Sequence, residues 1–280
     1  MKQYSFTRRI FNGRIRAFLS AVFALTIITV IAVSAWHYGD VGIRANFAIR
    51  NMPPSFSQWF GTDQMGRDMF ARTMHGLTLS LQVGIIAAGL SVIIALIIVL
   101  ISGFGKAADA ICSFIIDGML SMPHLVLLIL ISFALGGGTS AVIIAVAISH
   151  WPRFARILRA ELIQVRAAPW VEASRSFGKS RSFVLVNHIM PHLLPQMLVG
   201  FLLMFPHAIL HEAGLTFLGF GLEPSRPAIG IMLSDAMKHI VAGRWWLALF
   251  PGLALLIMVL CFDGLANGVR RLISPREART

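Results

Sequence analysis

Long apolar stretches alternate with short polar segments along this chain. Residues 18–36 read FLSAVFALTIITVIAVSAW, and residues 76–105 contain no Asp, Glu, Lys or Arg. A helix that crosses a hydrocarbon layer of about 30 Å needs about 20 largely apolar residues, because no water is present there to bond the backbone groups. The pattern therefore predicts six membrane-spanning helices, the fourth of them short, within residues 18–36, 76–105, 110–135, 141–151, 182–222 and 245–262.

The composition agrees with an all-α integral membrane protein. Hydrophobic residues make up 57% of the 280 residues, charged residues make up only 13%, and the mean hydropathy is +0.78. This is more apolar surface than one water-soluble core could bury. The outer loops are too short for a folded domain of ordinary size. We therefore expect one membrane domain, 18–268, preceded by a cytoplasmic segment, 1–17, and followed by a cytoplasmic tail, 269–280.

The charges are distributed unevenly between the two sides of the predicted membrane domain. The formal net charge is +12, and seventeen of the 24 Lys and Arg residues fall on one side if the helices alternate. Positive residues accumulate on the cytoplasmic side of membrane proteins, so we expect both termini in the cytoplasm and no nucleic-acid partner. AVSAW at residues 32–36 also resembles a signal-peptidase site, but the apolar stretch before it is longer than a cleavable signal, which favours a retained first helix.

Catalytic and nucleotide-binding motifs are absent from the sequence. The nearest approach to a phosphate-binding loop, GFGKA at residues 103–107, lacks the leading glycine and the hydroxyl residue that such a loop requires. Neither Gly-x-Ser-x-Gly nor His-Glu-x-x-His occurs. We therefore expect a protein that is not an enzyme and that binds no cofactor of its own. If it moves a solute uphill, the energy must come from another chain or from an ion gradient.

One internal segment is polar, EASRSFGKSRSFVLVNHIMP at residues 172–191. It belongs to a predicted cytoplasmic loop, 153–191, that carries seven Lys and Arg residues. Pro169 resets the backbone, residues 170–177 can form about two helical turns, and Gly178 is a natural C-terminal stop. A second helical stretch is expected from Ser180 until Pro191. The loop is either a solvated connection or a docking surface for a soluble partner.

The spacing within this segment resembles the EAA loop of bacterial ABC-importer permeases. That motif has Glu-Ala-Ala, three residues, Gly, nine residues and Ile-x-Leu-Pro, and the matching positions here are Glu172, Ala173, Ser174, Gly178 and Pro191. Ser174 replaces the second alanine, and His188 and Met190 stand at the Ile and Leu places. In that family the short helix inserts into a cleft of the ATPase subunit. The resemblance therefore implies that these residues couple ATP hydrolysis to the membrane helices.

Two further stretches resemble the C-type permeases of the dipeptide, oligopeptide and nickel importers. The stretch HEAGLTFLGFGLEPSRPAIGIML, residues 211–233, is similar to one family pattern, with Thr216 and Phe220 among its departures. The stretch FGTDQMGRDMFARTMHGLTLSL, residues 60–81, carries the family's outer motif at Gly61, Thr62, Asp63, Gly66, Arg67 and Asp68. From the residues themselves, the charged side chains of the outer motif can pair locally while its glycines permit turns. This stretch is thus an outer cap on the second helix or a place of direct substrate contact.

The resemblance covers roughly residues 60–275 and implies a type I ABC-importer permease fold with six transmembrane helices and a cytoplasmic coupling helix. It implies a multi-pass protein of the bacterial inner membrane. The implied partners are membrane lipid, a homologous second permease, two ATPase subunits that hold ATP and Mg²⁺, and an extracytoplasmic solute-binding protein. The implied substrates are nickel, metal chelates or peptides.

Ionisable residues inside predicted membrane helices are costly to bury and often functional. His207 and His211 are four residues apart and share a helix face, next to Glu212. Two imidazoles so placed can contact a transition metal transiently, or they can simply pack at a helix interface. The two histidines, Glu212 and Asp117 are therefore the candidate residues of the translocation path. The histidines favour a metal or metal chelate as the substrate.

Two other functional classes would use the same residues. A proton-coupled secondary transporter would use Glu212 and Asp117 as a relay and needs no ATPase; an inverted repeat would support it, and none is visible in the sequence. An intramembrane metalloprotease would use His207, His211 and Glu212, but the acid lies outside the histidine pair and no third ligand motif is evident. Three motifs in the correct order favour the importer permease.

Overall fold

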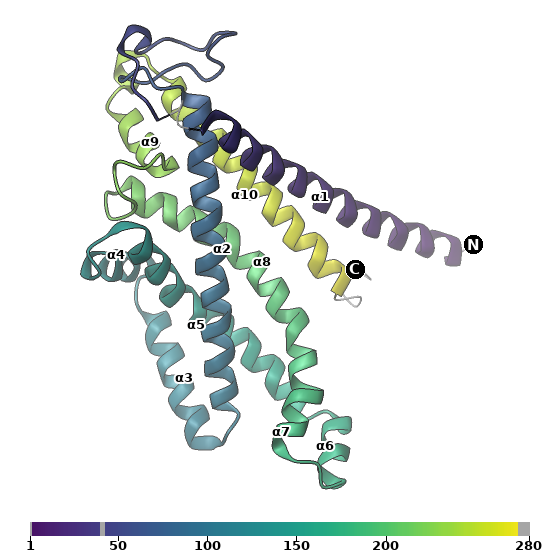
Figure 1. Ribbon diagram of the computed structural model, residues 1–280. Coiled ribbons are helices and arrows are strands. Elements are labelled where there is room, and N and C mark those ends of the chain that lie inside the picture. The colour runs from purple at the N-terminus through teal and green to yellow at the C-terminus, as the bar shows by residue number, and fades with distance from the viewer. Residues whose placement is uncertain (1, 40–42, 274–280) are drawn as a thin grey trace.

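The computed structural model is an assembly of helices and describes residues 2–39 and 43–273 (Figure 1). The predicted cytoplasmic tail, 269–280, therefore lies largely outside the described residues. Apart from a single bridge between Thr62 and Asp68, the described residues form no β-structure. The predicted all-α class is confirmed.

Long helices alternate with shorter ones along the chain. The long helices are α1 (Lys2–Tyr38), α2 (Met69–Ser102), α5 (Gly138–Arg166), α8 (Met190–Phe217) and α10 (Trp246–Ile273). The shorter elements are η2 (Phe47–Ile49), α3 (Lys106–Ser121), α4 (His124–Ala134), α6 (Pro169–Ser176), α7 (Arg181–Val184), the π-helix η3 (Leu185–Ile189), α9 (Ile229–Met237) and η4 (Ile240–Ala242). Figure 1 shows α6 and α7 at one end of α2, with α9 and the loop before α2 at the other end.

Within residues 2–39 and 43–273, five helical segments are long and apolar enough to cross a membrane. They are Phe18–Tyr38, Met69–Ser102, Gly138–Arg166, Arg181–Phe217 and Trp246–Arg270. The helices α3 and α4 together make a sixth if they form one span, although they are bent by 95° relative to each other. Pro123 is the N-cap of α4, where its missing N–H interrupts no helical hydrogen bond. The six predicted spans are thus present, with the third one broken, when this bent pair counts as one.

The fourth span is longer than the predicted stretch of residues 141–151, because α5 continues to Arg166. Its second half pairs Arg156 and Arg159 with carboxylates of α3 and buries Leu158 and Leu162. A prediction that requires an uninterrupted apolar stretch ends this span before its first arginine, Arg153. An amphipathic helix continues past it, because only the buried face has to be apolar.

The helical stretch expected to end at Pro191 continues instead. The short helix α7 leads through η3 into α8, and Pro191 lies in the first turn of α8. Proline cannot donate a backbone hydrogen bond, and the π-helical turn just before it changes the bonding pattern of the ladder. The fifth span is therefore the continuous segment Arg181–Phe217.

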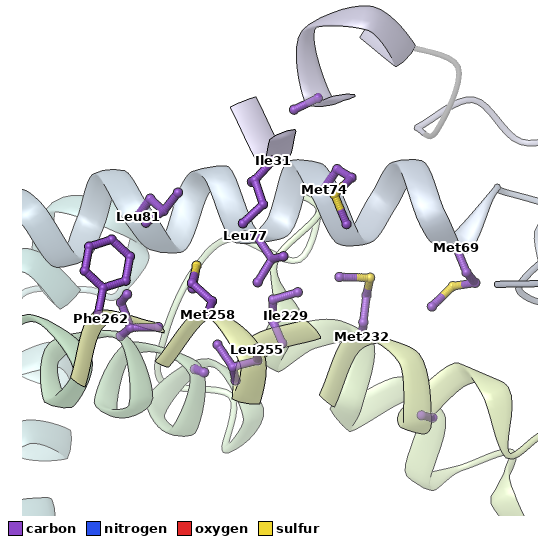
Figure 2. Packing of buried hydrophobic residues seen from close by; sticks show 14 of the residues in the cluster. Ile31, Met69, Met74, Leu77, Leu81, Ile229, Met232, Leu255, Met258 and Phe262 are labelled. Carbon is purple, nitrogen blue, oxygen red and sulfur yellow. The ribbon is translucent and has the colours of Figure 1, made fainter. Parts of the chain in front are cut away.

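The largest buried cluster joins α1, α2, α8, α9 and α10 (Figure 2). Figure 2 shows Ile31 of α1 near Leu77 of α2. Met232 of α9 and Met258 of α10 belong to the same cluster. The helix α1 lies near the start of the chain, and α9 and α10 lie near its end, so this cluster packs the two ends of the chain together.

A second buried cluster connects the membrane helices to the polar segment. It contains Val99 of α2, Leu158 of α5, Val171 of α6 and Leu193 of α8. Val171 thus packs α6 directly against the long helices.

Gly230 brings α9 against α8. A methyl group in its place would lie 2.4 Å from the carbonyl oxygen of Ala213 and 2.7 Å from Cβ of Thr216, so the helices would have to move apart. We expect Gly230→Ala to destabilise the protein by about 1 to 3 kcal/mol, the usual cost of overpacking, as measured by the thermal midpoint of the purified protein. Gly214→Ala is the matched control, because a methyl group there meets no described atom within 4 Å. Equal losses in both variants would contradict the packing argument.

Candidate functional site

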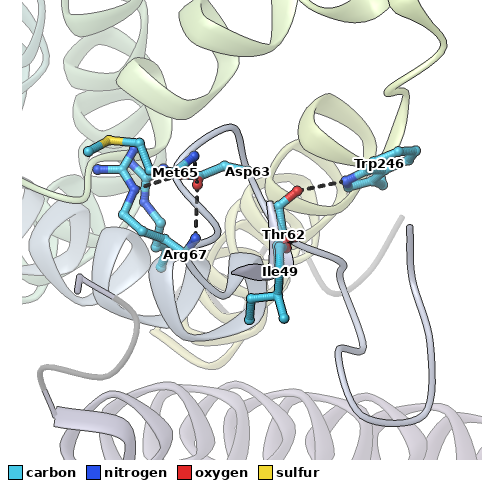
Figure 3. A network of polar contacts seen from close by, with 7 residues as sticks. Ile49, Thr62, Asp63, Met65, Arg67 and Trp246 are labelled. Atoms are coloured by element: carbon cyan, nitrogen blue, oxygen red, sulfur yellow. Dashed lines mark hydrogen bonds and ion pairs between the residues drawn. The ribbon is translucent and has the colours of Figure 1, made fainter. Parts of the chain in front are cut away.

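The loop before α2 is organised around the carboxylate of Asp63 (Figure 3). Its Oδ1 accepts hydrogen bonds from the backbone N–H groups of Met65 at 2.8 Å and Arg67 at 2.9 Å. Its Oδ2 accepts one from Nε of Arg67 at 2.6 Å and another from the guanidinium of Arg72. Asp63 is 3% exposed and Arg72 is 5% exposed, so water screens this ion pair very little. One buried carboxylate thus ties the loop to the first turn of α2.

The pKa of Asp63 lies below its ordinary value of 3.8. Burial raises this pKa, but the backbone and side-chain hydrogen bonds from Arg67 and the positive charges of Arg72 and Arg67 together lower it by more. Asp63 is therefore ionised throughout the physiological pH range.

Thr62 fixes the neighbouring backbone. Its Oγ1 accepts a hydrogen bond from the backbone N–H of Met52 at 2.9 Å and donates one to the carbonyl oxygen of Ile49. Its own carbonyl oxygen accepts a hydrogen bond from Nε1 of Trp246 at 3.2 Å, which joins the loop to α10. Thr62 is fully buried.

Asp68 and the two motif glycines complete this loop. Asp68 caps α2 by accepting a hydrogen bond from the backbone N–H of Ala71 at 3.0 Å, instead of joining the pair of Asp63 and Arg67. Gly66 has φ +72°, and a methyl group on it would lie 1.7 Å from the carbonyl oxygen of Asn46. Gly61 has a similar φ of +71°. The geometry favours the outer cap on α2 over direct substrate contact.

Glu212 is fully buried within α8. The hydroxyl of Ser80, in α2, donates to one of its carboxylate oxygens at 2.6 Å, and the hydroxyl of Thr216 donates to the other at 3.1 Å. The same Thr216 oxygen accepts a hydrogen bond at 3.2 Å from the backbone N–H of Leu222, beyond the end of α8. The carboxyl group of Glu212 therefore links α2, α8 and the turn that follows α8.

Asp117 has a different environment. Its carboxylate pairs with Arg156 of α5 at 2.7 Å, and the two side chains are 66% and 61% exposed. A proton relay through Asp117 and Glu212 would need a connection between the two groups. Their hydrogen-bond partners belong to separate parts of the molecule.

The histidines are arranged differently from the pair that the sequence suggests. His207 is exposed, whereas His211 is partly buried. The ring centroid of His211 lies 4.7 Å from that of His124 and 5.0 Å from that of His150. The rings of His124 and His150 are 4.7 Å apart. One predicted histidine thus joins two others, and one ligand atom from each of the three lies within 4.8 Å of the other two.

No motif in the sequence marks His124 and His150 as metal-ligating residues. His124 is the first residue of α4, just after the bend, and His150 lies in the middle of α5. They are distant from His211 in the chain, and only the packing of α4, α5 and α8 brings them together. The one available signal is an ionisable residue in the otherwise uncharged stretch 141–151.

The polar segment forms a helix that is anchored at one residue. Pro169 begins α6, and Gly178, with φ +75°, follows its end. Val171 is the one buried residue of α6, whereas Glu172 is exposed in the first turn. Two large apolar side chains at its ends are also exposed: Trp170 is 52% exposed and Phe177 is 83% exposed. Exposed aromatic side chains beside charged ones are typical of protein interfaces.

Sequence comparisons relate the chain to membrane transport proteins. A family model described as binding-protein-dependent transport system inner membrane component matches residues 83–278. The dipeptide transport system permease protein DppC of Bacillus subtilis (strain 168) is 32% identical over 238 residues, which cover 85% of this chain and 74% of the relative. A putative peptide transport system permease protein of Brucella suis biovar 1 is 34% identical over 264 residues, which cover 94% of this chain and 89% of the relative.

A solved structure shares the fold. It is the crystal structure of an amino acid ABC transporter with histidines, with a TM-score of 0.57 and 21% sequence identity. The match covers 71% of this chain and 92% of that chain.

Proposed function

Because this chain belongs to the binding-protein-dependent transport system inner membrane component family, we propose that it forms half of the solute pathway of a peptide importer. It is a permease subunit of an ABC importer, a multi-pass inner-membrane protein and not an enzyme. Membership of this family argues against the two alternatives that the sequence left open, a proton-driven secondary transporter and an intramembrane protease. The solute then crosses at the interface with a homologous second permease, after delivery by an external solute-binding protein.

The energy for transport comes from two ATPase subunits that bind ATP and Mg²⁺ on the cytoplasmic side, where both termini of this chain lie. The observation that supports this arrangement is the placement of α6. This helix lies at the end of the domain opposite the outer cap, exposes Glu172 and Phe177, and packs into the buried cluster through Val171. In our proposal, Glu172, Ala173 and Ser174 contact an ATPase subunit, Gly178 ends the coupling helix, and Pro191 lies where the coupling segment joins α8.

Peptides are the substrate class that we favour. The relatives that match this chain over most of their own length are named as dipeptide or peptide permeases. A metal chelate, including one of nickel, is the second substrate class. The observation that favours it is the partly buried cluster of His124, His150 and His211, next to the exposed His207. A peptide and a metal chelate have carboxylate and amine groups in common, so one pathway can accept both.

The proposal is tested by purifying the chain from its native membrane and identifying what accompanies it by mass spectrometry. A second permease and ATPase subunits are expected. Cells that lack the chain are then supplied with labelled dipeptides, tripeptides or a nickel chelate. Restoring the chain is expected to restore peptide uptake. Isolation as a lone chain under conditions that preserve a known importer, or uptake that does not depend on the chain, would contradict the proposal.

The metal branch has its own prediction. Replacing His207 and His211 together by alanine is expected to lower uptake of a metal-containing substrate without reducing assembly with the partner subunits, because both imidazoles are nitrogen ligands for transition metals. Metal uptake is measured with a radioactive ion, and assembly by co-purification. Unchanged metal uptake in the double variant would remove these two residues from the path.

A further inference from the structure

Three histidines from three helices meet where α4, α5 and α8 pack together. Their ring centroids are 4.7 to 5.0 Å apart, and the rings contact one another edge to face. The neighbouring acid, Glu212, accepts hydrogen bonds from the hydroxyls of Ser80 and Thr216 instead, one on each of its oxygens. The histidine cluster is thus a separate group of nitrogen ligands.

His150 has a buried nitrogen without a hydrogen bond. The residue is 9% exposed, and its Nδ1 lies 2.9 Å from the carbonyl oxygen of Val146 and 3.0 Å from Oγ of Ser149, which itself donates to that carbonyl oxygen at 3.1 Å. A carbonyl oxygen can only accept, so Nδ1 carries the proton and Nε2 of the neutral ring has a free lone pair. This Nε2 is buried and has no hydrogen-bond partner among the described residues. Metal-binding histidines are typically held in this way, with the second ring nitrogen donating to a carbonyl oxygen.

We infer that His124, His150 and His211 form a binding site for a divalent transition-metal ion such as Ni²⁺ or Zn²⁺. Imidazole nitrogens suit these ions. Metal–nitrogen bonds of about 2.1 Å in a tetrahedral arrangement place the nitrogens roughly 3.4 Å apart. The ligand atoms here lie within 4.8 Å of one another, so the side chains have to rotate to reach that spacing when the ion binds. Three protein ligands leave at least one coordination position open for another molecule.

The charge around the cluster indicates what fills the open position. The side chain of Arg153, about one turn after His150 in α5, brings a positive charge into the neighbourhood of His124 and His211. A carboxylate group on a ligand of the bound metal ion can pair with this cation. The site therefore suits a metal ion carried by an anionic chelator. The assignment of an anionic chelator rests on the proposed function, because a permease on the route of the solute encounters such complexes. The binding of the metal ion to the three histidines does not depend on that function.

Binding is measured on the intact transporter complex, purified through a tag that contains no histidine, by titrating Ni²⁺ against a competing metal indicator. The wild type is expected to bind one equivalent of Ni²⁺ per copy of this chain. A triple variant with His124, His150 and His211 replaced by glutamine is expected to lack this equivalent. Each single replacement is expected to weaken binding by tenfold or more, since even the loss of a residue that supports a ligand costs about 10- to 100-fold. His192→Gln is the matched control on α8, because that side chain pairs with Glu161 instead.

Equal Ni²⁺ binding by the wild type and the triple variant would overturn the inference. Loss of binding in His207→Gln, with retention in His124→Gln and His150→Gln, would overturn it as well. His124 is only partly buried at the start of a helix, so His124→Gln keeps the test usable if His150→Gln does not fold. Peptide uptake by the same cells separates the two proposals, because intact peptide uptake without Ni²⁺ binding refutes the metal site alone. Repeating the titration with Ni²⁺ citrate distinguishes an anionic complex, whose binding we expect, from the bare ion.

Discussion

Replacing Asp63 by asparagine is expected to destabilise the protein by about 3 to 5 kcal/mol, the cost of breaking a buried ion pair by removing one partner. The substitution keeps the size of the side chain but leaves Arg72, whose side chain is 6% exposed, without its counter-charge. It also weakens the charge-assisted bonds from Arg67 that hold the outer loop. The thermal midpoint of the purified protein measures the loss, which we expect to be large enough to reduce the amount of protein in the membrane.

The matched control for this variant is Asp117→Asn. It removes the same charge from an ion pair of similar length, 2.7 Å, but in a pair whose side chains are more than 60% exposed. Exposed ion pairs contribute about 0 to 1 kcal/mol, so the midpoint should hardly move. Similar losses in the two variants would show that burial of the Asp63 pair is not what makes it stabilising.

The same pair predicts how stability depends on pH. Because the pKa of Asp63 is lowered from 3.8 by folding, its contribution is fully present above pH 3.8 and is lost as the pH falls through the lowered value. The difference in thermal midpoint between the wild type and Asp63→Asn should therefore be constant from pH 5 to pH 8. It should shrink only in stronger acid. A difference that disappears between pH 5 and pH 8 would assign the effect to another group.

Replacing Gly178 by proline is expected to reduce transport to background while ATP hydrolysis by the complex continues. Gly178 has φ +75°, which proline cannot adopt because its ring fixes φ near −65°. The change therefore alters the chain direction after α6 and disconnects α6 from α7. Transport is measured as uptake by reconstituted vesicles, together with the ATPase rate of the same preparation.

Two other substitutions in α6 make this test specific. Gly178→Asn is the matched control: asparagine tolerates positive φ, and a side chain at this position meets no described atom within 4 Å, so transport should be retained. Glu172→Lys reverses an exposed charge in the first turn of α6 without a packing change and is also expected to uncouple hydrolysis from uptake. Normal transport in both Gly178→Pro and Glu172→Lys would refute the assignment of α6 as the coupling helix.

Local information was sufficient for the membrane helices and the short polar helix. A run of about 20 apolar residues has few stable alternatives to a transmembrane helix, because a backbone in hydrocarbon must satisfy its own hydrogen bonds. The ends of α6 were equally local, since Pro169 and Gly178 act within one turn of the chain. The requirement for an unbroken apolar run failed for α5 beyond Trp151. There the arginines lie on one face of the helix and the buried leucines on another.

The candidate site depended far more on packing. The sequence paired His207 with His211 because they share a helix face, but the tertiary structure leaves His207 exposed and joins His211 to His124 and His150. Glu212 was recognised as a buried acid, yet its partner Ser80 lies in another span. No spacing rule connects residues on α2, α4, α5 and α8, since their distance in space depends on how the helices cross.

The sequence by itself determined the all-α membrane class, the family of the chain and the position of the α6 segment, because these follow from apolar length, charge asymmetry and motifs within a few residues of one another. Only the tertiary structure decided which ionisable groups meet. It buried Asp63 with Arg72, enclosed Glu212 between two hydroxyls, and brought ligand atoms of three histidines from separate helices within 4.8 Å of one another. The physical reason is that burial and hydrogen bonding of a polar side chain are set by neighbours on other helices, which the local sequence does not specify.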